Sequence, residues 1–212
     1  FVEDFLPRAY RRPVTPAEVA AAVALGARAA ASDATSEPFL LQVRWILAGV
    51  LQSASFLYRL EGGEGAVVDG RSRLGPYELA SKLSYSLWGT MPNDELRGYA
   101  ASGRLSRPDT VTSIVKEMVA TPSFDRTLVD FHDQLFRIPA FSGVVRQSKL
   151  FPKFCPQFGA DAQEDVRRTI QDLIVTNPGT VADLYGSRAA WVNAPLAGVY
   201  GIDPASVPGL AA

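Results

Sequence analysis

The sequence is poor in the residues that usually hold cofactors. Among its 212 residues there is one cysteine, Cys155, and one histidine, His132. A single cysteine excludes an internal disulfide, a cysteine-rich zinc site and the Cys-x-x-Cys-His attachment of c-type haem within these residues. We therefore expect no cofactor-binding site and no metal site in this segment, and any such group would be held by other parts of a longer protein.

The sequence also lacks an excess of one charge and a long hydrophobic run. Its 21 Lys and Arg residues and 22 Asp and Glu residues leave a formal net charge of -1, which gives no general attraction to nucleic acid or anionic lipid. The best candidate for a membrane span, residues 39–51, is interrupted by Gln42 and Arg44 and is shorter than the roughly 18 to 20 apolar residues that cross a bilayer. We expect neither a nucleic-acid partner nor a transmembrane segment.

The familiar phosphate-binding and hydrolase loops are missing as well. Four glycines fall between Gly62 and Gly70, but no Gly-Lys-Ser/Thr follows them, so they predict a connecting loop rather than a nucleotide site. No Gly-x-Ser-x-Gly motif occurs, so a serine hydrolase with a Ser-His-Asp triad is not expected. The first residue is Phe1 rather than Met and no signal peptide is visible, so we expect the natural start to lie upstream.

Helix signals, in contrast, are abundant. The segment Thr15-Pro16-Ala17-Glu18 combines a threonine N-cap, a proline at the first helical position and a glutamate that can reach back to the cap. Such caps and apolar stripes of helical period predict an all-α fold of about nine or ten helices in an irregular orthogonal array. The predicted helices span residues 1–10, 16–31, 38–53, 76–88, 93–101, a segment capped by Ser106, a segment begun at Pro122, and residues 161–175, 181–185 and 193–200.

Apolar stripes also indicate how some of these helices pack. In residues 38–53 apolar side chains cover much of the circumference, so this helix is expected to be central. Its apolar residues are Leu40, Leu41, Trp45, Ile46, Ala48 and Leu51. The helix begun at Pro122 has a stripe that predicts its buried face, formed by Phe124, Leu128, Phe131 and Leu135.

Two segments do not have helical periodicity. Residues 56–61 alternate briefly between apolar and polar side chains and are followed by residues 66–70, which fits a short β-hairpin or an irregular loop near residues 56–70. Residues 137–158 contain three prolines among aromatic side chains, which indicates a long ordered loop rather than a disordered linker and a domain or subdomain boundary.

Several ordered blocks resemble two known families. The blocks Arg8-Ala9-Tyr10-Arg11-Arg12-Pro13 and Phe56-Leu57-Tyr58-Arg59-Leu60-Glu61 are similar to the domain-of-unknown-function family numbered 1595. Residues 77–85, Leu87-Trp88-Gly89-Thr90-Met91-Pro92, Phe131-His132-x-Gln134 and Trp191-Val192-Asn193-x-x-Leu196-Ala197-x-x-Tyr200-Gly201 are similar to the family numbered 1592. The resemblance implies a small helical domain at residues 1–61 and a larger helical domain at residues 62–212, truncated at its C-terminal side.

The resemblance carries expectations about function. Members of these families are large exported proteins of planctomycetes and myxobacteria, in which further domains and often a cytochrome-c-like domain lie alongside. It therefore implies an extracytoplasmic location, partner domains in the same polypeptide, and haem in another part of the full-length protein. The first hypothesis is a helical module of an oxidoreductase or electron-transfer assembly. The alternative is a non-catalytic scaffold or binding module for polysaccharide or a cell-envelope partner, so enzymatic activity stays open.

Two residues are candidates for catalysis, His132 and Glu164. His132 lies one position beyond Phe131 and could serve as a general base or ligand, or it could be a hydrogen-bonded histidine at a helix contact. Glu164 shares a predicted helix with other acids that could bind a hard metal ion, or it could form surface ion pairs with Arg167 and Arg168. A third hypothesis, a metal-assisted hydrolase, depends on His132 and these acids, which are Asp161, Glu164, Asp165 and Asp172.

Other side chains have a structural and a functional interpretation. Arg8, Arg11 and Arg12 end the first predicted helix, where cations offset the helix dipole or bind an acidic partner. Cys155 is expected to be a small buried hydrophobe rather than a reactive thiol. Six aromatic residues on apolar stripes are expected in the core rather than in a sugar platform, namely Tyr77, Tyr85, Trp88, Phe131, Phe136 and Trp191.

Overall fold

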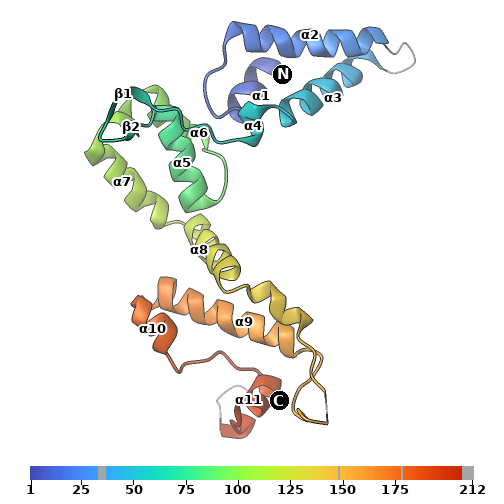
Figure 1. Cartoon of the computed structure of the whole chain (residues 1–212), viewed down its shortest axis with the longest axis vertical. Helices are drawn as coiled ribbons and strands as arrows, with labels where there is room; N and C mark the ends of the chain where they lie inside the picture. Colours follow the sequence, from blue (N-terminus) through green and yellow to red (C-terminus); the bar gives the residue numbers. More distant parts are fainter. Residues whose placement is uncertain (33–36, 148, 178, 207–212) are drawn as a thin grey trace. The chain divides into compact units, whose positions relative to one another are not determined.

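The computed structural model describes residues 1–32, 37–147, 149–177 and 179–206. The fold is all-α, as predicted, and the chain divides into two compact units, Phe1–Ala120 and Thr121–Ala212 (Figure 1). In the described ranges there are eleven α-helices, nine of which have seven or more residues. No helix in these ranges is long and apolar enough to span a membrane.

The first unit begins with a pair of long helices packed on a short one. Helices α2 (Pro16–Ser32) and α3 (Pro38–Leu51) lie side by side, and α1 (Val2–Ala9) and α4 (Ala54–Leu57) complete this part. Gly26 lets the α2–α3 pair approach closely, because a Cβ atom there would lie 2.8 Å from the Ile46 side chain. The buried cluster consists of Leu6, Ala9, Ile46 and Val50.

Helix α3 is not central, contrary to the prediction. Leu40 is 65% exposed and Trp45 is 49% exposed, and only Ile46 and Val50 are buried on this helix. The apolar side chains on its circumference exceed what α1 and α2 can cover. Periodicity therefore identified the helix correctly, but the expected burial of its whole circumference was wrong.

A hairpin is present, and it lies later in the sequence than expected. Strands β1 (Glu64–Val68) and β2 (Arg71–Arg73) pair antiparallel, whereas residues 56–61, expected as one strand, begin with the end of α4. The turn is Asp69-Gly70, and both residues have positive φ angles, 50° and 72°. That conformation is typical of the two-residue Asp-Gly turn that joins twisted strands.

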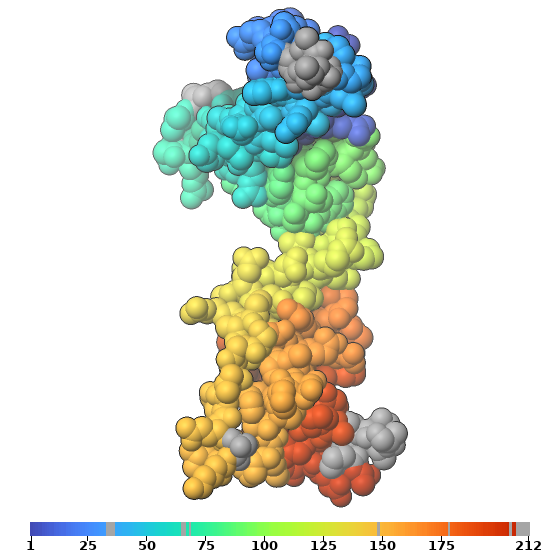
Figure 2. Space-filling model, turned by 90° about the vertical axis from the view of Figure 1, so that its right-hand side faces the viewer, coloured from blue at the N-terminus to red at the C-terminus, as the bar shows by residue number. Residues whose placement is uncertain are grey.

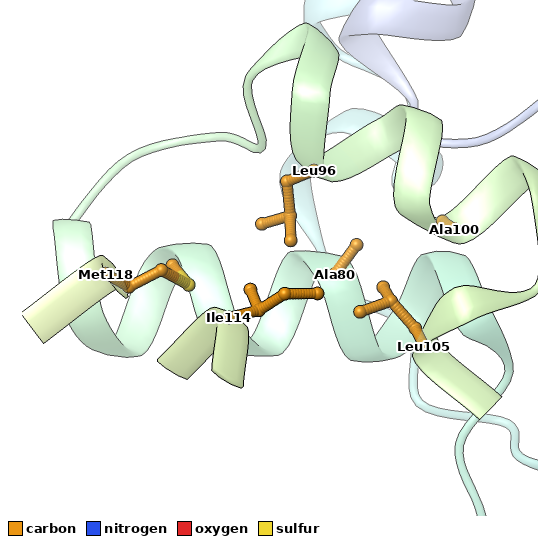
Figure 3. Packing of buried hydrophobic residues seen from close by; sticks show 6 residues of the cluster. All are labelled: Ala80, Leu96, Ala100, Leu105, Ile114 and Met118. Atoms are coloured by element: carbon orange, nitrogen blue, oxygen red, sulfur yellow. The ribbon is translucent and has the colours of Figure 1, made fainter. Parts of the chain in front are cut away.

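The remainder of the first unit is a compact helical core (Figure 3). It consists of α5 (Pro76–Trp88), α6 (Asp94–Ala101), the 3₁₀ turn η1 (Arg104–Ser106) and α7 (Pro108–Val119). Gly89 ends α5 in the left-handed conformation, and Asn93, where the sequence predicts that a helix begins, is the N-cap of α6. Ser106 does not cap α7; the N-cap is Arg107, which makes no side-chain capping bond. The buried residues are Ala80, Leu96, Ala100, Leu105, Ile114 and Met118.

The second unit is organised around α9 (Phe158–Gln171). The yellow segment before α9 contains α8 (Pro122–Leu135) and η2 (Ile138–Gly143), and both contact α9 (Figure 2). After α9 come the π-helical segment η3 (Asp172–Thr176), α10 (Val181–Gly186), α11 (Ala194–Tyr200) and η4 (Pro204–Ser206). The expected loop at residues 137–158 thus contains a 3₁₀ segment. The buried apolar residues of this unit are Ile138, Ala162, Ile170, Leu196 and Ala197.

Candidate functional site

His132 is buried on α8 and bonds to its own helix. Its Nδ1 lies 2.7 Å from the carbonyl oxygen of Leu128, and because a carbonyl only accepts, Nδ1 must carry the proton. The ring meets Phe131 edge-on, with centroids 5.1 Å apart, and stacks with Phe136 at 5.9 Å. The structure thus places His132 against a backbone carbonyl rather than a carboxylate, and a catalytic role for it stays a prediction.

The apolar stripe expected to bury α8 is only partly buried. Phe131 and Leu135 are both more than half exposed, while His132 is the buried residue of this helix. Polar bonding explains the difference, because both carboxylate oxygens of Asp133 accept from Arg167 of α9. Nε lies 3.0 Å from Oδ1 and 2.9 Å from Oδ2, and Nη2 lies 2.5 Å from Oδ2. This bidentate pair holds the face of α8 that carries Asp133, next to His132, against α9.

Glu164 lies on the exposed side of α9. Its Oε1 accepts a bond of 2.6 Å from Nε of Arg168, an i,i+4 pair in which both side chains are more than half exposed. This is the surface ion pair that the spacing suggests. Asp172 accepts instead from the side chain of Asn177, at 2.8 Å. The structure therefore does not bring Glu164 and Asp172 to one site, and catalysis by Glu164 stays a prediction.

Asp165 is the acid that the fold buries. It is 6% exposed, and its carboxylate accepts a 2.7 Å bond from the Trp191 backbone N–H and a 2.9 Å bond from the Tyr200 hydroxyl. Burial of the Tyr200 hydroxyl and its bond to Asp165 raise the pKa of Tyr200 to about 12. Tyr200 therefore stays a neutral donor to the Asp165 carboxylate at neutral pH.

A cleft of about 700 Å³ opens beside this carboxylate. Its polar lining residues include Asp165 and Thr169 of α9 and Tyr200 of α11. Its walls are mainly apolar and come from the end of α8, η2, α9, α10 and the segment after α10, with Arg188 among the polar lining residues. Aromatic and aliphatic wall residues are Phe136, Phe141, Val166, Ile170, Leu184, Tyr185 and Ile202. A concave, largely apolar site with a few convergent polar groups is the usual form of a small-molecule site.

The aromatic residues of this unit differ from the expectation of a buried core. Phe136 and Tyr185 meet edge-on with centroids 5.9 Å apart at the wall of the cleft, and Tyr185 is largely exposed. Trp191 is about half exposed, and the guanidinium of Arg168 lies 5.9 Å from its ring centroid. Trp191, like Phe131, is therefore not a core residue, and the prediction of burial is wrong for both. In the first unit, Tyr77, Tyr85 and Trp88 are half-buried.

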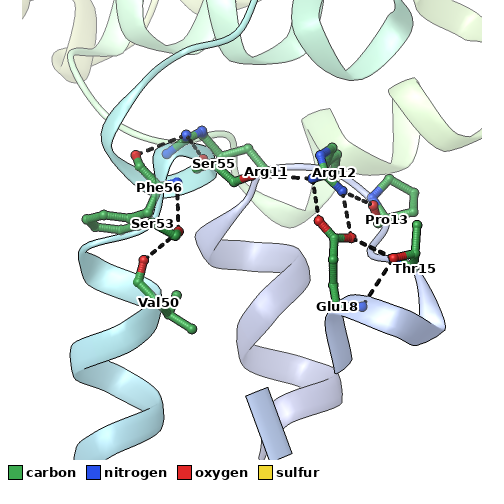
Figure 4. A network of polar contacts seen from close by, with 9 residues as sticks. All are labelled: Arg11, Arg12, Pro13, Thr15, Glu18, Val50, Ser53, Ser55 and Phe56. Carbon is green, nitrogen blue, oxygen red and sulfur yellow. Dashed lines mark hydrogen bonds and ion pairs between the residues drawn. The ribbon is translucent and has the colours of Figure 1, made fainter. Parts of the chain in front are cut away.

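The remaining candidates lie elsewhere. Cys155 is half-buried in the segment before α9. Arg8 forms an exposed ion pair of 3.3 Å with Asp94, and Arg11 and Arg12 bond to the α4 segment and to Glu18 (Figure 4). In the described part of the chain, no three His, Cys, Asp or Glu side chains are grouped so that they could hold a metal ion.

Family models match most of the chain. Model PSD4, described as a protein of unknown function (DUF1592), matches residues 74–202, which is more than half of the chain. The chain belongs to the DUF1592 family. Model PSD5, also described as a protein of unknown function (DUF1595), matches residues 1–61, so both resemblances inferred from the ordered blocks are confirmed. No curated protein and no solved structure matches the chain.

The DUF1592 match contains every residue that lines the cleft. It also crosses the division of the chain after Ala120, so the family segment and the compact units have different boundaries. The two predicted domains, residues 1–61 and 62–212, stay a prediction about which segments fold independently. The cleft is thus a feature of the DUF1592 segment alone.

Proposed function

We propose that the second unit of this DUF1592 protein is a non-catalytic binding module, and that its cleft binds a saccharide unit of a polysaccharide. The observation that carries the proposal is the hydrogen bond between the buried Asp165 carboxylate and the half-exposed Tyr200, inside a cleft with aromatic walls. A sugar ring has hydroxyl groups on its edge and C–H groups on its faces. A ligand of that kind requires acceptors and donors at one place and flat apolar surfaces around them.

The polar groups of the cleft retain capacity for a ligand. Each oxygen of the Asp165 carboxylate accepts one bond from the protein, and a carboxylate oxygen can accept a second. The Tyr200 hydroxyl donates to Asp165 and keeps its acceptor lone pairs. Arg188 lines the cleft and is exposed, so it can donate to a hydroxyl or a carboxylate of a sugar. These groups can together bind several hydroxyls at fixed positions.

The same geometry favours binding over hydrolysis. Glycoside hydrolysis normally uses two carboxyl groups, one as acid and one as base or nucleophile. Among the described residues that line the cleft, Asp165 is the only acid, and it is held by two donors on its own fold. The raised pKa of Tyr200 keeps its proton in place, so Tyr200 is suited to hydrogen bonding rather than proton transfer.

The first hypothesis from the family resemblance concerned redox work. A role in an oxidoreductase or electron-transfer assembly, and an extracytoplasmic location, stay predictions that depend on the domains found beside relatives. The metal-assisted hydrolase likewise stays a prediction with no additional support. The binding hypothesis, in contrast to these two, requires only residues that line the cleft.

Glycan-array binding by the intact chain tests the proposal. We expect binding to a limited set of glycans and a loss of affinity of about tenfold in Tyr185→Ala, because this exposed ring forms part of the wall. Phe131→Ala is the matched control, since Phe131 is also an exposed aromatic of the same unit but does not line the cleft. Absence of glycan binding, or equal loss in both variants, would refute the proposal.

A further inference from the structure

A second, smaller cavity lies in the first unit, and it is rich in arginine. We propose that this cavity of about 180 Å³ binds a single oxyanion group: a sulfate, a phosphate or a carboxylate. It lies where the segment after α1, the segment after α4 and α5 meet, so the residue blocks of both families line it. The residues that matter most are Arg11, Arg12, Arg59, Tyr58, Tyr77 and Glu78.

The guanidinium of Arg11 is only partly used by hydrogen bonds within the fold. It is 7% exposed, and its φ angle of 59° is unusual for a residue other than glycine. Nη2 donates to the carbonyl oxygens of Ser55, Phe56 and Tyr58 at 2.6, 3.1 and 3.0 Å, two of which appear in Figure 4. In the described part of the chain every side-chain hydrogen bond of Arg11 comes from Nη2, and Nε and Nη1 are not among the fully buried atoms that lack a partner. These N–H groups belong to a side chain that lines the cavity and are available to an anion.

Arg59 is the second arginine of the cavity, and unlike Arg11 it is exposed. Its guanidinium lies 4.8 Å from the ring centroid of Tyr85, and that of Arg11 lies 5.9 Å from the same ring. Two cations therefore share one aromatic ring, and in the described part of the chain neither forms an ion pair with a carboxylate. Two cations beside one ring repel one another, and an anion bound next to both would offset that repulsion.

The acids near the cavity are already engaged. Glu18 pairs with Arg12, whose Nη1 and Nη2 donate at 3.1 and 2.7 Å. Glu78 lines the cavity, but its carboxylate accepts from the backbone N–H groups of Gly62, Gly63 and Gly75. Lys82 pairs with Glu61 outside the cavity. Within the described residues, no carboxylate therefore pairs with the guanidinium groups of Arg11 and Arg59.

Size and geometry select an oxyanion. Drug-sized ligands usually occupy about 300 to 1,000 Å³, so a cavity of about 180 Å³ suits a tetrahedral or planar anionic group rather than a nucleotide. The planar guanidinium fork matches sulfate, phosphate and carboxylate oxygens in bidentate fashion. Tyr58 and Tyr77 also line the cavity, and their hydroxyls are further donors. The anion can be a free ion or the charged end of a larger ligand, since these sources share the same chemistry.

Calorimetric titration of the intact chain tests this site with sodium sulfate, sodium phosphate and sodium acetate, each against sodium chloride at equal ionic strength. We expect saturable binding of at least one oxyanion and an affinity reduced by about tenfold or more in Arg59→Gln. Arg44→Gln is the control, because Arg44 is exposed on α3 and does not line the cavity. The preferred anion then distinguishes a sulfate or phosphate ligand from a carboxylate.

Two results would overturn the site. One is heat that does not saturate or that matches chloride for all three anions. The other is equal weakening in Arg59→Gln and Arg44→Gln, which would indicate screening of the general charge. Arg59 is used because Arg11 holds three backbone carbonyls, and its replacement would disturb folding. The site lies outside the saccharide cleft, so failure of either proposal leaves the other standing.

Discussion

The Tyr200 hydroxyl donates a 2.9 Å hydrogen bond to the buried carboxylate of Asp165 and thereby joins α11 to α9. The same carboxylate accepts the backbone N–H of Trp191, at the other end of the segment that leads into α11. One side chain of α9 therefore fixes both ends of the block that runs from Trp191 to Tyr200. Hydrogen bonds from two donors offset much of the free energy needed to bury a carboxylate. Removing one donor leaves part of that free energy uncompensated and destabilises the fold.

Tyr200→Phe removes one of these donors and should destabilise the second unit. We expect the free energy of unfolding in urea to fall by about 1.5–3 kcal/mol, the range for a hydrogen bond to a charged group. Tyr185→Phe removes a hydroxyl that makes no hydrogen bond within the described residues and should change it by less than about 0.5 kcal/mol. Equal effects of the two substitutions would show that the Asp165–Tyr200 bond does not stabilise the fold.

Alkaline pH should weaken the same contact. The pKa of Tyr200 is raised to about 12, first by burial and then by the bond to Asp165, from an ordinary value of 10.0. The folded state therefore holds this proton more tightly than the unfolded state. Its contribution is fully present below pH 10 and is lost as the pH rises toward 12. The free energy of unfolding should fall more steeply in this window for the native chain than for Tyr200→Phe, and parallel curves would contradict this.

Acid should weaken the start of α2. Glu18 accepts bonds from Arg12 and from the backbone N–H of Thr15, and in that order these lower its pKa from 4.5 to about 2. A lowered pKa contributes stability that is present above pH 4.5 and is lost as the pH falls toward 2. Glu18→Gln keeps a residue that can close the capping box but removes the charge. Urea unfolding between these pH values should therefore depend less on pH in Glu18→Gln, and unchanged dependence would refute the assignment.

Two glycines of the second unit should respond oppositely to alanine. A Cβ at Gly159 would lie 2.4 Å from the Phe141 carbonyl oxygen and 2.8 Å from the Ser142 Cα, so Gly159→Ala should cost about 1–3 kcal/mol through displaced backbone. A Cβ at Gly198 of α11 meets nothing within 4 Å, so Gly198→Ala should stabilise by about 0.5–1 kcal/mol. Thermal melting checks both, and a neutral Gly159→Ala would show that η2 does not pack on α9 as described.

Local signals in the sequence predicted most helix boundaries. Thr15 and Glu18 form the expected capping box. The Thr15 backbone N–H donates to Oε2 of Glu18 at 2.8 Å, and the Glu18 backbone N–H donates to Oγ1 of Thr15 at 3.2 Å. Gly89 and Asn93 end and begin helices as predicted, because these signals act within one turn. The hairpin lies later in the sequence than the alternation of residues 56–61 indicates, because the Asp69-Gly70 turn determines which segments pair.

Packing was harder to predict than the helices themselves. The stripes of α3 and α8 identify an apolar face, but only the tertiary fold decides whether another element covers it. In the described part of the chain, Leu40 and Phe131 stay largely exposed. The burial of Asp165 was not predicted, because charged side chains usually lie on the solvated face of a helix. The position of Asp165 on the helix indicates burial instead. Ala162 and Thr169 lie three and four residues away, on the inner side of α9. Its partners could not be inferred, because they are 26 and 35 residues distant and depend on the path of the chain after α10.

Amide chemical shifts of isotope-labelled protein, titrated with cellotriose or trigalacturonate, locate a bound saccharide without any substitution. We expect saturable shifts at the amides of Thr169, Arg188 and Trp191, with the neutral and acidic probes differing at Arg188. Trp191 reports directly on Asp165, to which its N–H donates, whereas amides of α2 and α3 should not move. Saturating titrations in which neither probe shifts these three amides, or in which the shifts lie elsewhere, would contradict a saccharide site in this cleft.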